Sequence, residues 1–191
     1  MAEVGLFDGT VTSAEERRDF LALLALPPAS RLLEVGTDPC DAADESFDAV
    51  LCIDAIAQRR DRGAALADWA RIVKPGGRIL YTDPAIVAGL VTNDELAARG
   101  SMGFFVFSPQ GENESLIESA GLRLLRADDA TDTAALVAGR RLRERRSREA
   151  ELVHAEGRER FDALQRFLDV AHRLAASRRL ARIAFLAGKA S

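Results

Sequence analysis

Short apolar runs and longer amphipathic stretches alternate along the chain. Residues 47–53 form an apolar run with β-branched members that is too short for a typical helix, so we expect a strand covered on both faces. Residues 64–73 place apolar side chains at helical spacing, which predicts an amphipathic helix. The sequence K-P-G-G at 74–77 ends this helix, and residues 78–82 return as a strand. Such a strand–helix–strand unit predicts a right-handed parallel pair.

The residues before this unit predict one helix and one strand. Ser13 and Glu16 fit a capping box, and the helix that they open ends before Pro27 and Pro28. The apolar run at 31–36 then predicts a buried strand that ends in Gly36.

Helices and strands also alternate after the unit. Residues 92–95 favour a helix start, and residues 101–109 form a compact aromatic loop or a short strand. A further helix ends at Gly121, and residues 122–126 read as the next strand.

A helical insertion precedes the last predicted strand, at 183–186. The insertion covers residues 133–180, and Gly157 is expected to separate its two helices. Residues 140–148 of the first helix are mostly arginine. Glutamates interleave with these arginines, so a solvated helix is favoured over a surface that grips phosphate or nucleic acid.

The composition narrows the classes of function. A chain of 191 residues suits one domain, and its net charge of −4 gives no general attraction to nucleic acid. The two cysteines and two histidines lack metal-site spacing, which predicts neither a metal centre nor a disulfide framework. No apolar run approaches the ~20 residues that cross a bilayer, and no signal peptide is visible at the N-terminus. We therefore expect a cytoplasmic protein.

The unit at 46–84 resembles a known family. SFDAVLCIDAI, a helix, the K-P-G-G turn and RILYTDP are similar to the fourth strand through the fifth strand of class I S-adenosylmethionine-dependent methyltransferases. Glu34 and Gly36 resemble the start of that family's cofactor motif. The helix before Gly121 and the two strands after it resemble the family's final helix and strand pair, and the helical insertion resembles the substrate lids of small-molecule methyltransferases.

The resemblance breaks after Gly36. The family continues with further glycines, E/D-x-G-x-G-x-G, and then with a helix and a second strand, whose terminal acid holds the ribose. A second helix and a third strand follow. Here Asp41 and Ala42 resemble the adenine-contacting segment after that third strand, and the strand at 47–53 follows directly. We interpret this as an internal deletion. It leaves the strand at 31–36 at the sheet edge, to be covered by the N-terminal helix or a partner.

We therefore predict an α/β fold. It is a shortened, Rossmann-like and mostly parallel sheet of about five strands, with a helical cap inserted before the last strand. We expect a single methyltransferase-like domain at 1–191. Its parts are the N-terminal helix (1–30), the core (31–84), a lid segment (85–110), the helical cap (133–180), and the last strand and tail (181–191).

The resemblance also implies a cofactor site at the carboxyl ends of the strands. It would consist of Glu34, Val35, Gly36, Thr37, Asp41, Ala42, Ile53, Asp54 and Ala55. The candidate bases are Asp54, Asp83 and His154. An N-cap role explains Asp54 equally well, turn chemistry explains Asp83 equally well, and a solvated position is favoured for His154.

Aromatic and thiol side chains admit two readings as well. Phe104, Phe105 and Phe107 either line a substrate pocket or belong to the core, and we favour the core for at least one of them. Cys52 lies within an apolar strand and is expected to be a core residue.

Two functions remain open at the level of sequence. The first is methyl transfer from S-adenosylmethionine to a small molecule, which the lid and Asp54 favour. The second is a catalytically inactive relative that serves as a binding or dimerisation module, which the missing glycines and acidic strand favour. The expected partners are a small-molecule substrate and a second copy of the chain, and neither a membrane nor nucleic acid.

Overall fold

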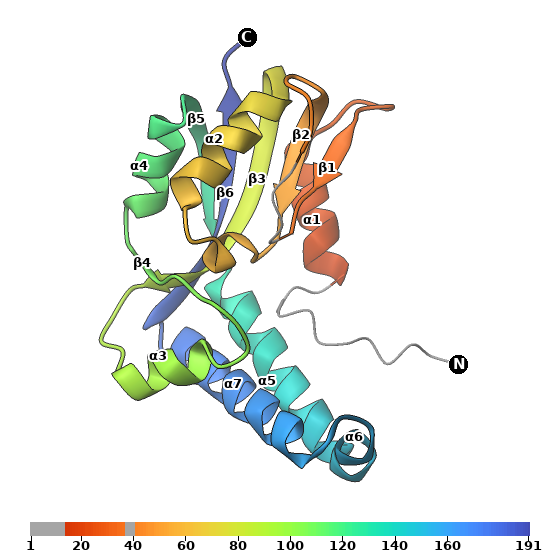
Figure 1. Cartoon of the computed structure of the whole chain (residues 1–191), viewed down its shortest axis with the longest axis vertical. Helices are drawn as coiled ribbons and strands as arrows, with labels where there is room; N and C mark the ends of the chain where they lie inside the picture. Colours follow the sequence, from red (N-terminus) through yellow and green to blue (C-terminus); the bar gives the residue numbers. More distant parts are fainter. Residues whose placement is uncertain (1–13, 37–40) are drawn as a thin grey trace.

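The computed structural model describes residues 14–36 and 41–191 of the chain (Figure 1). In these residues the elements are α1 (Ala14–Leu24), β1 (Leu32–Glu34), β2 (Phe47–Cys52), the 3-10 helix η1 (Ile56–Gln58), α2 (Arg62–Ile72), β3 (Val73–Val87), α3 (Asn93–Arg99), β4 (Ser108–Pro109), α4 (Glu112–Ser119), β5 (Leu122–Asp129), α5 (Thr131–Ser147), α6 (Glu149–Glu156), α7 (Arg158–Ala176) and β6 (Leu180–Lys189). The predicted capping residue Ser13 lies outside the described residues.

The strands form one sheet with the order β1-β2-β3-β6-β5, and the short β4 pairs with β3. The pairs β1–β2, β2–β3 and β3–β4 are parallel, and β6 is antiparallel to both β3 and β5. This confirms the predicted α/β fold with its mostly parallel sheet and a final antiparallel pair. The described residues contain six strands instead of about five, because β4 forms within the predicted aromatic loop.

The β2–α2–β3 unit forms as predicted, with one correction. The Asp61 side chain caps α2 by accepting from the Ala64 N–H at 2.7 Å, and the helix ends at Ile72. The K-P-G-G segment is not a separate turn between helix and strand but lies within the first part of β3. The chain extends at once because Val73 already pairs with Phe47, and the register then shifts before Arg78.

Residues 74–77 still need their glycines. Gly76 has φ +74°, which is left-handed and favours glycine. A Cβ on Gly77 would lie 2.8 Å from the Asp48 carbonyl oxygen, so the close approach of β2 and β3 leaves no space for a side chain.

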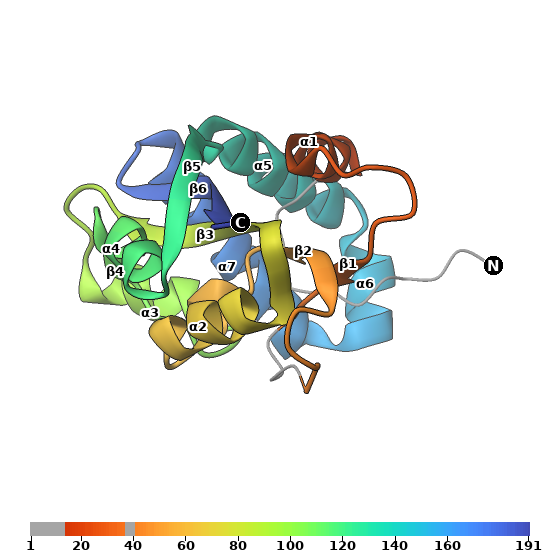
Figure 2. The same cartoon turned by 90° about the horizontal axis from the view of Figure 1, so that it is seen from above.

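Alternating side chains of the sheet build a core on each face. Ile79, Tyr81 and Phe185 face α2 and α4, together with the fully buried Trp69 of α2. Leu51, Leu80 and Leu186 face the other side, where Phe20 and Leu24 of α1 cover them. Figure 2 shows α2 and α4 on one side of the sheet and α1 and α5 on the other. Leu32 of the edge strand β1 packs against the same cluster as α1.

The cap consists of α5, α6 and α7, which lie with α3 beyond one end of the sheet (Figure 1). Ala138 of α5 packs with Ala171 of α7, and Leu142 packs with Phe167 and Leu168. Gly157, with φ +87°, separates α6 from α7 as predicted. A second break at Arg148 was not predicted, so the described insertion contains three helices and not two.

Candidate functional site

The carboxyl ends of the parallel strands meet at the edge of the sheet that faces the cap (Figure 1). Val35 and Gly36 follow β1, Asp54 follows β2 by two residues, and Asp83 lies in the second half of β3. Glu34 pairs with Leu51, so the ends of β1 and β2 are side by side. In open α/β sheets, ligands bind at this kind of edge.

Asp54 is buried and is hydrogen-bonded to residues of two strands, β3 and β6. Its carboxylate accepts from the Arg182 Nε and from the Thr82 hydroxyl, both at 2.7 Å, and its own N–H donates to the Thr82 oxygen at 2.8 Å. Its φ of +58° is left-handed, a conformation in which Asp is tolerated better than most residues. The N-cap of η1 is Ala55, which has no side-chain cap, so the expected N-cap alternative for Asp54 is wrong.

Arg182 of β6 connects this strand end to the N-terminal helix. Its Nη1 donates to the Glu16 carboxylate at 2.5 Å, and its side chain is 1% exposed. Glu16, expected to serve a capping box, therefore ties α1 to the last strand. Two carboxylates share one guanidinium here, which holds the end of β2 in a fixed position.

Asp83 is completely buried in a second polar cluster. It accepts from Arg62 Nη1 at 2.5 Å, from the Ser108 hydroxyl at 2.9 Å and from the Asn113 amide at 2.8 Å. It also accepts from the Ala85 N–H at 3.0 Å. These donors come from α2, β4, α4 and β3 itself, so this carboxylate joins four elements. The arrangement is typical of a structural residue.

The predicted cofactor residues after β1 are more open. Glu34 is exposed and forms an ion pair with Arg17 at 2.5 Å. Gly36 is exposed, no atom lies within 4 Å of an added Cβ, and its carbonyl accepts from Arg59 Nη2 at 2.9 Å. Val35 is buried. Thr37 lies outside the described residues.

The remaining predicted cofactor residues differ in exposure. The side chain of Asp41 is exposed, and Ala42 packs at the margin of the core beside α2. Ile53 is half-buried against the α1 side of the sheet, and Ala55 is buried on the other side. Exposed groups therefore gather after β1, and buried groups after β2.

The structure does not bring His154 to this edge. It is exposed on α6, which lies at the far end of the cap from the strand ends (Figure 1). Cys52 is buried, and burial raises the pKa of its thiol to about 12, in agreement with a core residue. Among the described residues, no group of three or more His, Cys, Asp or Glu side chains is placed to hold a metal ion.

Arg99 was not predicted as a site residue. It ends α3, is 3% exposed, and contacts the rings of Phe105 and Phe167, with 4.6 Å from its Cζ to each ring centroid. Phe105 also stacks on Phe107 at 6.3 Å. The only sequence signal near this position was the aromatic run at 101–109, which could line a pocket. The sequence contains many arginines, and nothing in its pattern distinguishes this one from the solvated ones.

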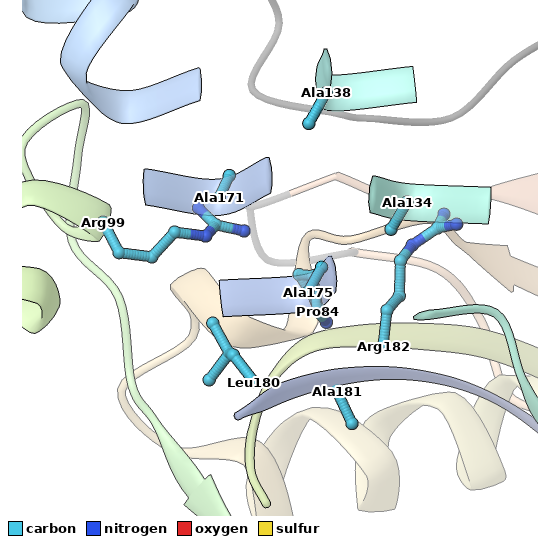
Figure 3. Close-up of a pocket in the computed structure, with 9 residues that line it drawn as sticks. All are labelled: Pro84, Arg99, Ala134, Ala138, Ala171, Ala175, Leu180, Ala181 and Arg182. Atoms are coloured by element: carbon cyan, nitrogen blue, oxygen red, sulfur yellow. The ribbon is translucent and has the colours of Figure 1, made fainter. Parts of the chain in front are cut away.

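Arg99 and Arg182 line a small cavity between the cap and the sheet (Figure 3). Its volume is about 20 Å³, close to the space of one water molecule. Its other lining residues are small or apolar: Pro84, Ala134, Ala138, Ala171, Ala175, Leu180 and Ala181. A wider groove of about 360 Å³ lies at the opposite end of the sheet, beside Lys74 and Gly77. Neither hollow is lined by Gly36 or Asp41.

Comparison with known proteins gives consistent results. Residues 12–81 match the family described as "Methyltransferase domain". The chain is 33% identical over 96 residues to the methyltransferase GfsG of Streptomyces halstedii, and 34% identical over 98 residues to the O-methyltransferase rstn1 of Aspergillus nomiae. These matches cover 47% and 50% of this chain, but 34% and 43% of the relatives. The chain thus spans less than half the length of these curated relatives.

Solved structures show the same fold. The cyclopropane synthase MmaA2 of Mycobacterium tuberculosis superposes with a TM-score of 0.79 at 15% identity, covering 99% of this chain and 90% of that one. Phosphoethanolamine N-methyltransferase 2 of Haemonchus contortus superposes with a TM-score of 0.69 at 16% identity, covering 79% of this chain and 35% of that one. In the described part of the chain, every helix is too short or too polar to cross a bilayer.

Proposed function

We propose that the chain, as a relative of the class I S-adenosylmethionine-dependent methyltransferases, transfers a methyl group from S-adenosylmethionine to a small molecule. The open end of β1 carries this proposal. Gly36 leaves its backbone accessible, and the exposed carboxylates of Glu34 and Asp41 lie before and after it in sequence. A ligand with a positive sulfonium and hydroxyl groups fits such a surface.

The residues present fit the cofactor in part. Gly36 allows a close backbone approach, and Asp41 with Ala42 resembles the family's adenine-contacting segment. In the described sheet no strand lies beyond β1, so the family's acidic second strand has no counterpart there. Glu34 is therefore our candidate for the ribose hydroxyls, which requires it to leave Arg17. We keep Val35, Thr37, Ile53, Asp54 and Ala55 in the proposed cofactor site.

The cofactor supplies a methyl group that is already activated. The chain then has to position the acceptor in line and exclude water, and it needs a base only for acceptors that must lose a proton. Asp54 borders the cap and is our first candidate, although its carboxylate is engaged by Arg182 and Thr82. Asp83 and His154 stay secondary candidates, because one is enclosed by four donors and the other lies far from the strand ends.

A second function is favoured by two observations at the end of β1. Glu34 is bound to Arg17, and neither hollow reaches Gly36, which suits a relative that no longer takes cofactor and serves as a binding or dimerisation module. This alternative predicts a stable fold without affinity for S-adenosylhomocysteine.

Calorimetric titration with S-adenosylhomocysteine separates the two functions. We expect micromolar binding to the native chain and loss of binding in Gly36→Val. The substitution meets open space, so the apo fold is expected to persist. Ala190→Val is the matched control, since it adds the same type of bulk at an exposed position at the opposite end of the sheet.

The outcomes are distinct. Equal affinity of the native chain and Gly36→Val would remove Gly36 from the site. Absence of heat at millimolar ligand, in a chain that unfolds cooperatively, would overturn the methyltransferase proposal and leave the binding module.

A further inference from the structure

Arg99 is held in a fixed orientation by two aromatic rings. The rings of Phe105 and Phe167 both contact its guanidinium, each with 4.6 Å between the ring centroid and Cζ. Cation–π stacking of this kind engages the faces of the planar group. The N–H groups at its edge remain available for a hydrogen-bonding partner.

That edge has no partner in the described part of the chain. Nη1 of Arg99 is buried without a hydrogen bond, and no carboxylate lies within salt-bridge distance. The neighbouring arginines differ: Arg62 binds Asp83, and Arg182 binds Glu16 and Asp54. A buried donor without a partner costs about 1–3 kcal/mol, and more when it is charged. Native proteins keep such groups where a ligand or a water completes them.

The cavity beside Arg99 has the composition of a binding site for a small anionic group. Figure 3 shows Arg99 and Arg182 reaching into the space under the cap, with alanines of α5 and α7 around them. The walls contributed by these helices are Ala134, Ala138, Ala171 and Ala175, which offer no side-chain hydrogen bond. A polar group that enters must therefore be bound by the arginines or by backbone.

Arg99 carries its positive charge under ordinary conditions. Burial lowers the pKa of its guanidinium to about 10, and the nearby Asp54 and Asp83 oppose that effect. It is therefore protonated at neutral pH.

We propose that this cavity receives a carboxylate group, bound by the edge of Arg99, and that this group is the acid end of the small-molecule substrate. The first part stands on the cavity and the unpaired donor, and the second part rests on the proposed methyl transfer. A carboxylate matches the planar fork of a guanidinium. With a volume of about 20 Å³, the cavity has room for no more than the end group of a ligand. Through Arg182, the same cavity adjoins Asp54 at the end of β2.

Acetate is the probe for the carboxylate site, and acetamide is its neutral isostere. Thermal unfolding is followed with each at tens of millimolar, with chloride holding the ionic strength constant. We expect acetate to raise the unfolding midpoint of the native chain by several degrees more than acetamide does. Arg99→Gln should lose this difference, and Arg99→Lys should keep part of it, because lysine retains the charge but not the fork.

Arg178→Gln is the matched control. Arg178 is exposed and pairs with Asp129 and Asp132 at the surface, so its replacement should leave the acetate effect unchanged. An equal effect of acetate and acetamide, or an acetate effect that persists in Arg99→Gln, would overturn the proposal. If Arg99→Gln does not fold, NMR of the ¹⁵N-labelled guanidinium groups in the native chain decides. A shifted Arg99 signal with acetate supports the site, and an unmoved signal rejects it.

The substrate part is tested separately from the cofactor. Binding of S-adenosylhomocysteine without an acetate effect would reject this site and leave the methyltransferase proposal standing. An acetate effect without S-adenosylhomocysteine binding would establish a carboxylate site in a chain that does not take the cofactor. It would then reject the assignment of this carboxylate to a methyl acceptor.

Discussion

Replacing Asp83 by asparagine removes the carboxylate that holds Arg62 in the interior. The side chains of the two residues are 0% and 4% exposed, so the guanidinium cannot turn to water without local unfolding. Breaking a buried pair in this way costs about 3–5 kcal/mol, because one charge is left uncompensated. The free energy of unfolding of a typical domain is about 5–15 kcal/mol, so this loss is a large fraction of the stability. We therefore expect Asp83→Asn to be folded but strongly destabilised.

Urea unfolding monitored by tryptophan fluorescence measures this effect. Trp69 is the only tryptophan, is 1% exposed, and lies 6.0 Å from Tyr81 between ring centroids, so its emission should report on the same core. Asp128→Asn is the control, because Asp128 and its partner Arg126 are 35% and 58% exposed. Asp128→Asn should lower the free energy of unfolding by no more than about 1 kcal/mol. A destabilisation below about 1 kcal/mol for Asp83→Asn would refute the structural role and strengthen Asp83 as a candidate base.

Two further predictions concern a thiol and a carboxylate. In Cys40→Ser, the single remaining thiol of Cys52 should react with a disulfide reagent only as fast as the protein unfolds, because burial raises its pKa to about 12; rapid labelling under native conditions would contradict this. Hydrogen bonds to Glu95, foremost from Arg179 and then from the Thr92 N–H, lower the pKa of Glu95 to about 2 from 4.5. A lowered carboxyl pKa stabilises the fold above the unfolded-state value, so the stability difference between the native chain and Glu95→Gln should shrink as pH falls from 4.5 to 2. The unfolding free energy of both proteins is measured by denaturation at several pH values in this range. A difference between them that stays constant with pH would contradict the prediction.

The order of helices and strands could be predicted from local sequence patterns. The buried polar clusters could not. The run at 47–53 and the stripe at 64–73 fixed β2 and α2 because periodicity and burial agree there. The ion pair of Arg182 with Glu16 joins residues 166 positions apart, so no local sequence pattern predicts it. The break at Arg148 also escaped prediction, since arginine and glutamate favour continuing a helix. The family resemblance placed Gly36 in the cofactor motif, but nothing in the sequence predicted the open space around it.

The position of β6 has a consequence for how the protein is made. The last strand in sequence lies in the interior of the sheet, between β3 and β5, and its Arg182 also completes the contacts of α1 and of the β2 end. During synthesis, β3 and β5 therefore keep facing edges unpaired until residues 180–189, which form β6, have left the ribosome. Such long-range closure is slow and exposes strand edges meanwhile. A chain released before residue 180 is made would lack β6. The edges of β3 and β5 that β6 normally pairs with would then be open to aggregation.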